Sequence, residues 1–208
     1  MRTVSKDNKR MTGSKVKVIG VGGGGIRIVN AMRRNNTTKI DYVGIDTDIT
    51  SLNNAHILKK LQIGSLLTKG LGTKANISTG RNAVLDDYNR IRDIISGTDS
   101  VFLIAGMGGG TGTGSLPIIA KIAQDKAPLV ICLVTKPYNF EGVKRIKIAD
   151  IGIAELRNIG TAYFILPLEL TFGLPRRLKR TLIENFKVAD EIIAQTTVSL
   201  INITSHYL

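Results

Sequence analysis

The sequence predicts an α/β fold in which a parallel sheet is covered by helices on both faces. Short runs of β-branched and other apolar residues alternate with stretches of helical periodicity. Several of these runs are continuously apolar, as strands are when both faces of a parallel sheet are buried. The two densest glycine clusters, at 20–25 and 106–114, each lie between a predicted strand and a predicted helix. In such a sheet, ligands bind beyond the carboxyl ends of the strands.

The first half of the chain supplies two of the predicted strands. Val16–Ile19 and Tyr42–Ile45 are short runs of residues that favour extended backbone. Between them, apolar residues recur at helical spacing from about Ile26 to Arg33. A longer helix is predicted at Ser78–Ile95, because capping residues stand at its start and Gly97 follows its end.

The second half contains three further strands, two helices between them and a long final helix. These elements are predicted at Val101–Ala105, Thr113–Asp125, Leu129–Val134, Val143–Asn158, Ala162–Leu166 and about Pro175–Thr204. Crossovers between parallel strands in this alternation are right-handed. The final helix carries apolar residues over most of its circumference. One face is expected to pack on the sheet and the other to stay exposed, open to a partner or to self-association.

Length and composition fit a domain with a buried core. The 208 residues are 43% hydrophobic and 22% charged. No apolar run approaches the ~20 residues that a bilayer span needs, and the first fifteen residues lack the apolar core of a secretory signal. The single cysteine, Cys132, excludes an internal disulfide, and its apolar neighbours predict a buried, unreactive thiol. A cytoplasmic protein is therefore expected.

The basic residues are unevenly distributed. Residues 1–40 hold ten Lys and Arg residues and one acid, Asp7, and account for most of the net charge of +13. A second basic cluster lies between Arg176 and Arg180. Neither cluster has interleaved aromatic residues on which bases could stack. Solvated surfaces are therefore expected and a nucleic-acid partner is disfavoured, with contact to a polyanion or a membrane surface as the alternative.

The first glycine cluster follows the first predicted strand. Gly20, Gly22 and Gly25 satisfy the spacing G-x-G-x-x-G, and Asp46 ends the second predicted strand. This arrangement is typical of a Rossmann dinucleotide-binding unit, in which glycines let the backbone approach a pyrophosphate. An NAD(P)-dependent oxidoreductase is therefore one alternative. Five glycines in six positions satisfy many motif patterns, so this cluster alone does not identify the ligand.

The second glycine cluster, GMGGGTGTG at 106–114, follows a strand of the buried type. Two such clusters at the carboxyl ends of strands in one sheet would meet at one crevice. Glycine allows close approach of phosphate oxygens, the helix that follows offers unpaired N–H groups, and Thr111 and Thr113 add hydroxyl donors. The chain has no G-x-x-x-x-G-K-[ST] sequence, so amides and a cation would meet the phosphate charge.

The second cluster also resembles the signature of the FtsZ family, the bacterial cell-division GTPases of the tubulin superfamily. Five segments resemble FtsZ segments and occur in the family's order: VKVIGVGGGG, QIGSLLTKGLGTKAN, STGRNAV, FLIAGMGGGTGTG and VTKPYNFEGVKR. The resemblance is close over 15–150 and looser to about 193. It implies a Rossmann-like GTP-binding domain at 15–175, followed by a core helix with a truncated end at 176–208. The resemblance does not cover residues 1–14, whose basic composition predicts a flexible arm.

The resemblance implies a bound GTP or GDP, with Mg²⁺ held through phosphates and water rather than by a protein ligand set. The phosphate contacts that it implies are Gly22, Gly23, Gly24, Gly109, Gly110, Thr111 and Gly112. It places Gly72 and the loop 69–75 near the γ-phosphate. It makes Thr135, Glu141 and Arg145 the ribose and nucleotide-edge contacts, and a carboxylate such as Glu141 suits hydroxyl donors.

The resemblance assigns the base to the final helix. Phe186 matches the residue that stacks on the base, and Asp190, four residues on and on the same helical face, matches the residue that reads guanine. A carboxylate accepts from both N1–H and N2–H₂ of guanine, a donor pair that adenine lacks. The alternatives are that Phe186 belongs to the core and that Asp190 is a solvated helix charge.

Four residues depart from the family pattern at the nucleotide site. Ile26 and Arg27 stand where glycine and asparagine are usual, and Asp46 and Leu168 each stand where an asparagine is expected. Each change loses or alters a polar contact worth roughly 0.5–1.5 kcal/mol, so weakened rather than abolished nucleotide binding is expected. Arg27 could also add a charge-assisted phosphate contact.

The final departure concerns catalysis. In FtsZ, a loop of aspartates after the central helix reaches the nucleotide of the next subunit and positions the attacking water. The last stretch here, TTVSLINITSHYL, contains no Asp or Glu. No catalytic residue is therefore predicted, and hydrolysis by a polymer of this chain alone is expected to be badly impaired.

The function predicted is that of a GTP-binding cell-division protein that joins filaments of FtsZ-type subunits at the division site. Its hydrolysis would depend on a partner's acidic loop, and division-site proteins are further candidate partners. The alternative is a degenerate homologue with a structural or capping role and little GTPase activity.

Overall fold

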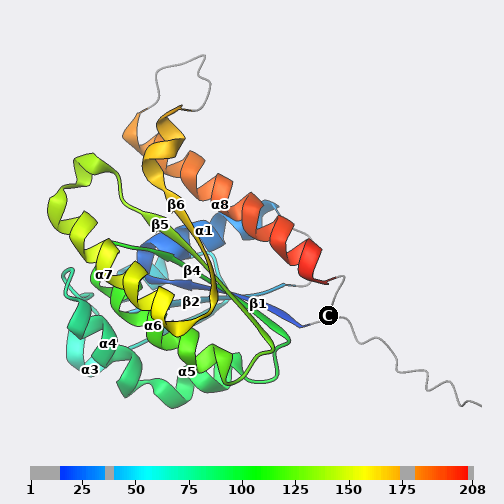
Figure 1. Ribbon diagram of the computed structural model, residues 1–208. Helices are drawn as coiled ribbons and strands as arrows, with labels where there is room; N and C mark the ends of the chain where they lie inside the picture. Colours follow the sequence, from blue (N-terminus) through cyan, green and yellow to red (C-terminus); the bar gives the residue numbers. More distant parts are fainter. Residues whose placement is uncertain (1–14, 36–39, 174–180, 206–208) are drawn as a thin grey trace, which may run out of the picture.

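The computed structural model describes residues 15–35, 40–173 and 181–205. The predicted arm at 1–14 and the basic cluster between Arg176 and Arg180 lie outside the described residues. Six parallel strands form one sheet in the order β3-β2-β1-β4-β5-β6 (Figure 1). The strands are β1 (Val16–Val21), β2 (Ile40–Asp46), β3 (Lys59–Gln62), β4 (Ser100–Gly106), β5 (Leu129–Lys136) and β6 (Ala162–Pro167). The predicted α/β class with a parallel sheet is confirmed.

Helices cover both faces of this sheet (Figure 1). One face carries α4 (Ile77–Asp86), α5 (Tyr88–Ile95), α6 (Gly110–Gln124) and α7 (Val143–Ile159). The opposite face carries α1 (Gly22–Asn35), α2 (Ile49–Asn53) and α8 (Leu182–Ser205). The remaining short elements are α3 (Ser65–Thr68) and the 3₁₀ helices η1 (Asn139–Glu141) and η2 (Leu168–Gly173).

The central strands are apolar at successive positions because each face of the sheet has its own core. In β4, Val101 and Leu103 pack beneath α4–α7, whereas Phe102 and Ile104 pack beneath α1 and α8. All four side chains are fully buried. Cys132 lies in β5 within the first of these cores, and burial raises the pKa of its thiol to about 12. The predicted burial of this thiol is confirmed.

Both glycine clusters enter helices earlier than the sequence predicts. α1 begins at Gly22 rather than near Ile26, and α6 begins at Gly110 rather than Thr113. The first turn of α1 lies directly against the sheet, because a Cβ added to Gly25 would be 2.1 Å from the carbonyl oxygen of Ile104. Glycine therefore lets each helix start immediately beyond its strand, and the loops are shorter than expected.

The prediction of a single helix at Ser78–Ile95 is wrong. The chain breaks it at Asp87, whose backbone (φ −108°, ψ 20°) separates α4 from α5. The Asp87 carboxylate accepts a hydrogen bond from the Gly64 N–H at 2.7 Å and another from Arg90 Nη1 at 2.6 Å. A contact made 23 positions away in sequence thus fixes the break, and helical periodicity carries no sign of it.

Neither β3 nor α2 is predicted from the sequence pattern. In β3, Lys59 and Lys60 are exposed and only Leu61 is buried, because β3 is the outermost strand on its side of the sheet. It therefore has no continuous apolar run. The start of α2 is fixed by Asp48, whose side chain accepts hydrogen bonds from the backbone N–H groups of Thr50 and Ser51 at 2.8 and 3.3 Å.

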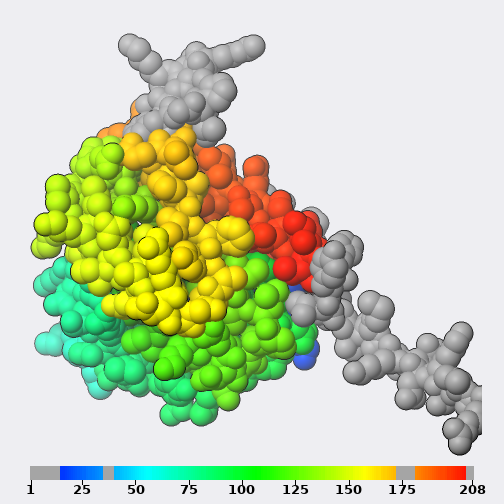
Figure 2. All heavy atoms as spheres, viewed as in Figure 1, coloured from blue at the N-terminus to red at the C-terminus, as the bar shows by residue number. Residues whose placement is uncertain are grey.

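The long final helix is α8, which lies at the surface (Figure 2) and packs mainly against α1. Thr181 and Glu184 cap its start reciprocally: Thr181 N–H donates to Glu184 Oε2 at 2.6 Å, and Glu184 N–H donates to Thr181 Oγ1 at 3.3 Å. Ile193 and Ile201 are buried against the sheet, as expected of one face. The opposite face is less apolar than expected, since its large exposed apolar side chains in the described part are Leu182, Ile183 and Ile203. No described helix, α8 included, is long and apolar enough to cross a membrane.

Candidate functional site

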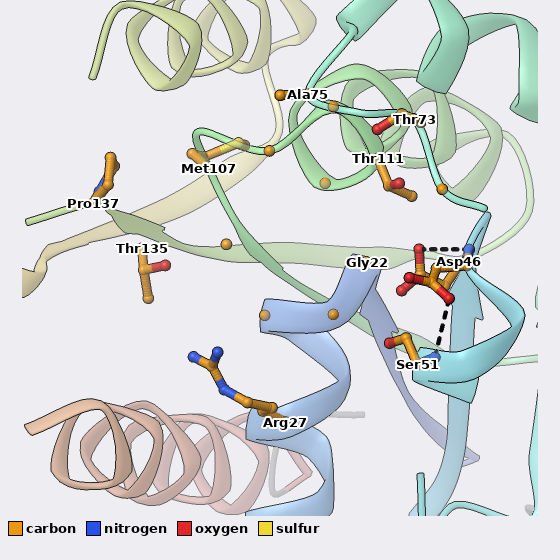
Figure 3. Close-up of a pocket in the computed structure, with 18 of the residues that line it drawn as sticks. Gly22, Arg27, Asp46, Ser51, Thr73, Ala75, Met107, Thr111, Thr135 and Pro137 are labelled. Atoms are coloured by element: carbon orange, nitrogen blue, oxygen red, sulfur yellow. Dashed lines mark hydrogen bonds between the residues drawn. The ribbon is translucent and has the colours of Figure 1, made fainter. Parts of the chain in front are cut away.

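A crevice of about 400 Å³ opens beyond the carboxyl ends of β1, β2, β4 and β5, where the strand order reverses (Figure 3). The structure brings all fourteen residues predicted as nucleotide contacts to its walls. They are Gly22, Gly23, Gly24, Asp46, Gly72, Gly109, Gly110, Thr111, Gly112, Thr135, Glu141, Arg145, Phe186 and Asp190. Figure 3 shows Thr111, Asp46 and Ser51 toward one end of the crevice and Arg27 and Thr135 toward the other.

Two helix N-termini reach this crevice, because α1 starts at Gly22 and α6 at Gly110. Each provides unpaired backbone N–H groups and the positive end of a helix dipole, which together favour an anion. Gly23 and Gly109, one from each cluster, leave room for an anion beside the backbone. A Cβ at Gly109 would meet nothing within 4 Å, and one at Gly23 would make only ordinary contact with Ser51 Oγ at 3.5 Å. The backbone is therefore open to phosphate oxygens at both N-termini.

Other glycines of the same clusters serve packing instead. A Cβ at Gly112 would lie 2.5 Å from the carbonyl oxygen of Gly106, and one at Gly114 would lie 2.3 Å from that of Ile77. Such approaches exclude any side chain. The clusters therefore combine two roles, tight helix packing and an open anion cradle.

The two threonines of the second cluster differ in role. Thr111 lines the crevice, and its hydroxyl lies 2.7 Å from that of Thr47, which follows β2. Thr113 is fully buried, and its hydroxyl accepts a hydrogen bond from the Gly108 N–H at 2.9 Å. The expectation that Thr113 supplies a donor to a ligand is therefore wrong, because its hydroxyl holds the turn before α6.

The loop 69–75 forms one wall of the crevice from Leu71 to Ala75. Lys69, Lys74 and Ala75 all adopt left-handed backbone conformations, with φ of 52°, 50° and 61°. A left-handed backbone conformation is energetically unfavourable for residues other than glycine, and such residues cluster at functional sites. The loop is held against the start of α6, since a Cβ at Gly110 would lie 2.2 Å from Thr73 Oγ1.

Asp46 is a buried carboxyl group at the end of β2. Its Oδ1 accepts hydrogen bonds from the backbone N–H groups of Thr47 and Asp48, at 2.7 and 3.3 Å. Burial nevertheless raises the pKa of Asp46 above its ordinary value, because desolvation outweighs these bonds and a further one with Ser51. Asp48 and Ser51 also line the crevice, and neither was predicted as a site residue. Their only signal was a polar stretch directly after a buried strand.

We expect Asp46→Asn to stabilise the free protein at neutral pH. The raised pKa means that ionising Asp46 costs more in the folded than in the unfolded state, so stability is lost as pH rises through the folded pKa. The thermal unfolding midpoints of the two proteins should differ least below about pH 3, where the carboxyl is protonated in both the folded and the unfolded state. Above that, the variant should be the more stable. A difference that stays constant from pH 3 to pH 8 would contradict this.

Glu141 and Arg145, two of the predicted nucleotide contacts, belong to a hydrogen-bonded group around η1. Glu141 Oε1 accepts from the Tyr138 N–H at 2.9 Å, and Glu141 Oε2 accepts from Arg145 Nη1 at 2.7 Å. The Glu141 side chain is only 12% exposed. Its position is thus fixed at the crevice wall, with lone pairs still available to hydroxyl donors.

An aromatic cluster lies at the α8 end of the crevice. Phe186 meets the buried Tyr138 edge to face, with ring centroids 5.1 Å apart. Leu168 and Ala189 are buried beside them. Phe186 is only partly buried and also lines the crevice. It therefore belongs to a small core cluster and also borders the crevice.

Asp190 is not a solvated helix charge, because its side chain is only 13% exposed and pairs with Arg27. Arg27 Nε donates to Oδ2 at 3.1 Å and Nη2 donates to Oδ1 at 3.3 Å. Burial raises the pKa of Asp190, and Arg27 opposes that rise. Arg27 thus lies at the α8 end of the crevice and contacts Asp190, so the phosphate contact expected of it is not the arrangement observed.

Comparison with known proteins identifies the family. The Tubulin/FtsZ family, GTPase domain, matches residues 15–169. The cell division protein FtsZ of Pseudomonas aeruginosa is 42% identical over 179 residues, which make up 86% of this chain and 45% of that protein. FtsZ of Haemophilus influenzae is 36% identical over 214 residues, covering 93% of this chain and 50% of that protein. The chain spans about half the length of these curated relatives.

Solved structures agree. An empty FtsZ dimer from M. jannaschii matches with a TM-score of 0.86 at 32% identity, over 95% of this chain and 59% of that chain. The GTPγS-bound protofilament of CetZ2 from Haloferax volcanii matches with a TM-score of 0.81 over 92% of this chain and 59% of that one, and at 22% identity it shows a common fold. This chain belongs to the tubulin/FtsZ family, and residues 15–169 are its GTPase domain.

Proposed function

We propose that the crevice binds GTP and GDP and that the protein acts in FtsZ-type filaments at the division site of the cytoplasm. One observation carries this proposal. The amino termini of α1 and α6 and the largely buried carboxylates of Asp190 and Glu141 all meet in one crevice at the reversal of strand order. Each part matches one part of a nucleotide: phosphates, base and ribose.

The proposed contacts follow from this geometry. The phosphates would lie against Gly23 and Gly109, where the backbone is open, with the N–H groups of both helix starts directed at them. The ribose would lie by Glu141. The base would lie against Phe186 with its N1–H and N2–H₂ donated to Asp190, an arrangement that selects guanine over adenine.

Mg²⁺ fits this crevice only as a companion of the phosphates. Among the described residues, no group of three or more His, Cys, Asp or Glu side chains could hold a metal ion. Phosphate oxygens and water would therefore supply most of the coordination, as Mg²⁺ commonly accepts. The charge it supplies there would neutralise the phosphates beside the buried carboxyl of Asp46.

A nucleotide panel tests the proposal. Purified protein is titrated calorimetrically with GTP, GDP, ATP and NAD⁺, each with and without Mg²⁺. GTP and GDP should bind, and ATP and NAD⁺ should bind at least tenfold more weakly, since adenine offers Asp190 no donor pair. Binding of none of the four, or preference for NAD⁺, would overturn the proposal.

Assembly and hydrolysis form a second part of the proposal. The M. jannaschii relative is described as a dimer and CetZ2 as a protofilament, which supports association of this chain with FtsZ-type subunits. Hydrolysis in such filaments would use an acidic loop of the neighbouring subunit, as the resemblance to FtsZ implies. We therefore expect added full-length FtsZ to raise phosphate release from GTP beyond the rate of that FtsZ by itself. No increase on mixing the two proteins would contradict this part of the proposal.

A further inference from the structure

Arg27 occupies the place where the proposed function puts a base. Its guanidinium bridges both carboxylate oxygens of Asp190, through Nε at 3.1 Å and Nη2 at 3.3 Å. Its central carbon also lies 5.3 Å from the centroid of the Phe186 ring. One side chain therefore engages both the carboxylate and the aromatic ring assigned to base recognition.

The guanidinium presents the same pattern of donors as a guanine edge. Guanine offers two neighbouring in-plane N–H donors, from N1 and N2, and the arginine fork offers two neighbouring in-plane N–H donors of its own. Both groups are planar and both can lie against an aromatic face. A bidentate partner uses the facing lone pairs of both Asp190 oxygens, so the arginine fork and the guanine edge cannot both make this contact at once.

The two partners differ in their freedom to move. The Asp190 side chain is 13% exposed and is held on α8, whereas the Arg27 side chain is 54% exposed. Figure 3 shows Arg27 extending from α1 at the edge of the crevice. Arg27 can thus turn out into solvent while Asp190 stays in place.

We propose that Arg27 is a specificity-determining residue that competes with the guanine base for Asp190. This inference rests on the proposed function. In the free protein the guanidinium substitutes for the base, and a guanine nucleotide binds by displacing it. The cost of displacement falls on every ligand whose base reaches Asp190 and on no ligand that binds through phosphates alone.

Removing Arg27 should therefore tighten guanine nucleotide binding. A partly exposed ion pair together with an exposed cation–π contact corresponds to roughly 3- to 30-fold in affinity. We expect Arg27→Asn to lower the Kd for GDP by about tenfold. Arg27→Lys, which keeps the charge but loses the planar fork, should give a smaller gain. The affinity for tripolyphosphate, which has no base, should change little.

A charge-matched control comes from the same helix. Arg34 lies two turns along α1 and acts on Asp190 through its charge, so Arg34→Asn removes an equal charge without removing the fork. It should change GDP affinity far less than Arg27→Asn. Asp190→Ala should weaken GDP binding. Adding Arg27→Asn to Asp190→Ala should give little of the tenfold gain in GDP affinity, because the carboxylate for which Arg27 and the base compete is then absent.

These titrations separate the inference from the proposed function. If wild-type protein binds GDP and Arg27→Asn leaves its Kd unchanged, the competition is wrong. If Arg27→Asn weakens binding of both GDP and tripolyphosphate, Arg27 is instead a phosphate ligand and the inference is overturned. If neither wild type nor any variant binds GDP, the proposed function fails and the inference fails with it.

Discussion

Replacing Gly25 by alanine is expected to prevent the domain from folding stably. The new Cβ would lie 2.1 Å from the carbonyl oxygen of Ile104, a distance that real Cβ atoms do not adopt. Ile104 lies in β4, which is fixed between β1 and β5, so the strand cannot retreat. We expect a loss of about 4 kcal/mol or more, which is most of the stability of a typical domain. Chemical denaturation followed by circular dichroism measures it.

Gly23→Ala is the matched control, since it changes the same first turn of α1 by the same methyl group. A Cβ at Gly23 would be 3.5 Å from Ser51 Oγ, which is ordinary contact. This variant should fold with nearly unchanged stability. Equal stability of the Gly25 and Gly23 variants would show that α1 and β4 are not packed as closely as described.

Gly109→Ala is expected to weaken nucleotide binding tenfold or more without destabilising the fold. Gly109 is extended, with φ −96° and ψ 168°, so alanine adopts its conformation without strain. Its Cβ would stand in open space at the crevice wall, beside the amino terminus of α6. A methyl group there would exclude phosphate oxygens from the backbone, and we expect the Kd for GDP to rise tenfold or more, about 1.4 kcal/mol.

The stability of the Gly109 variant distinguishes this effect from damage to the fold. Alanine lowers the entropy of the unfolded chain, so the free protein should be unchanged or more stable by up to ~1 kcal/mol. Gly109→Val, with a larger side chain, should weaken GDP binding further. Wild-type affinity in both variants would mean that the phosphates do not lie against this backbone.

The periodicity of apolar residues was sufficient to predict the strands and helices that pack into the two large cores. The strands around β4 and the helices α6 and α7 were predicted within a few residues, because burial on both sides forces a run of apolar residues and helical packing forces a 3.6-residue period. β3 was missed because an outermost strand buries little. The break at Asp87 was missed because a hydrogen bond from Gly64, distant in sequence, creates it.

The residues of the site could be named from sequence because their motifs are local. The two glycine clusters and the segment around Glu141 are contiguous strings, and the resemblance supplied Phe186 and Asp190. Asp48 and Ser51 could not be found, since neither belongs to a recognisable pattern. Their place in the crevice follows from the turn that α2 makes after β2.

The sequence by itself determined the fold class, the family and the residues that line the crevice. The reason is that apolar strand runs, helical periodicity and glycine spacing are all patterns of residues close together in sequence. Only the tertiary structure decided what those residues do to one another. It divided the glycines into those that face the crevice and those that contact a strand, because that depends on which backbone lies opposite. It also places Arg27 against Asp190 rather than beside the glycine clusters. These two residues are 163 positions apart in sequence, and α1 and α8 meet only in the folded chain.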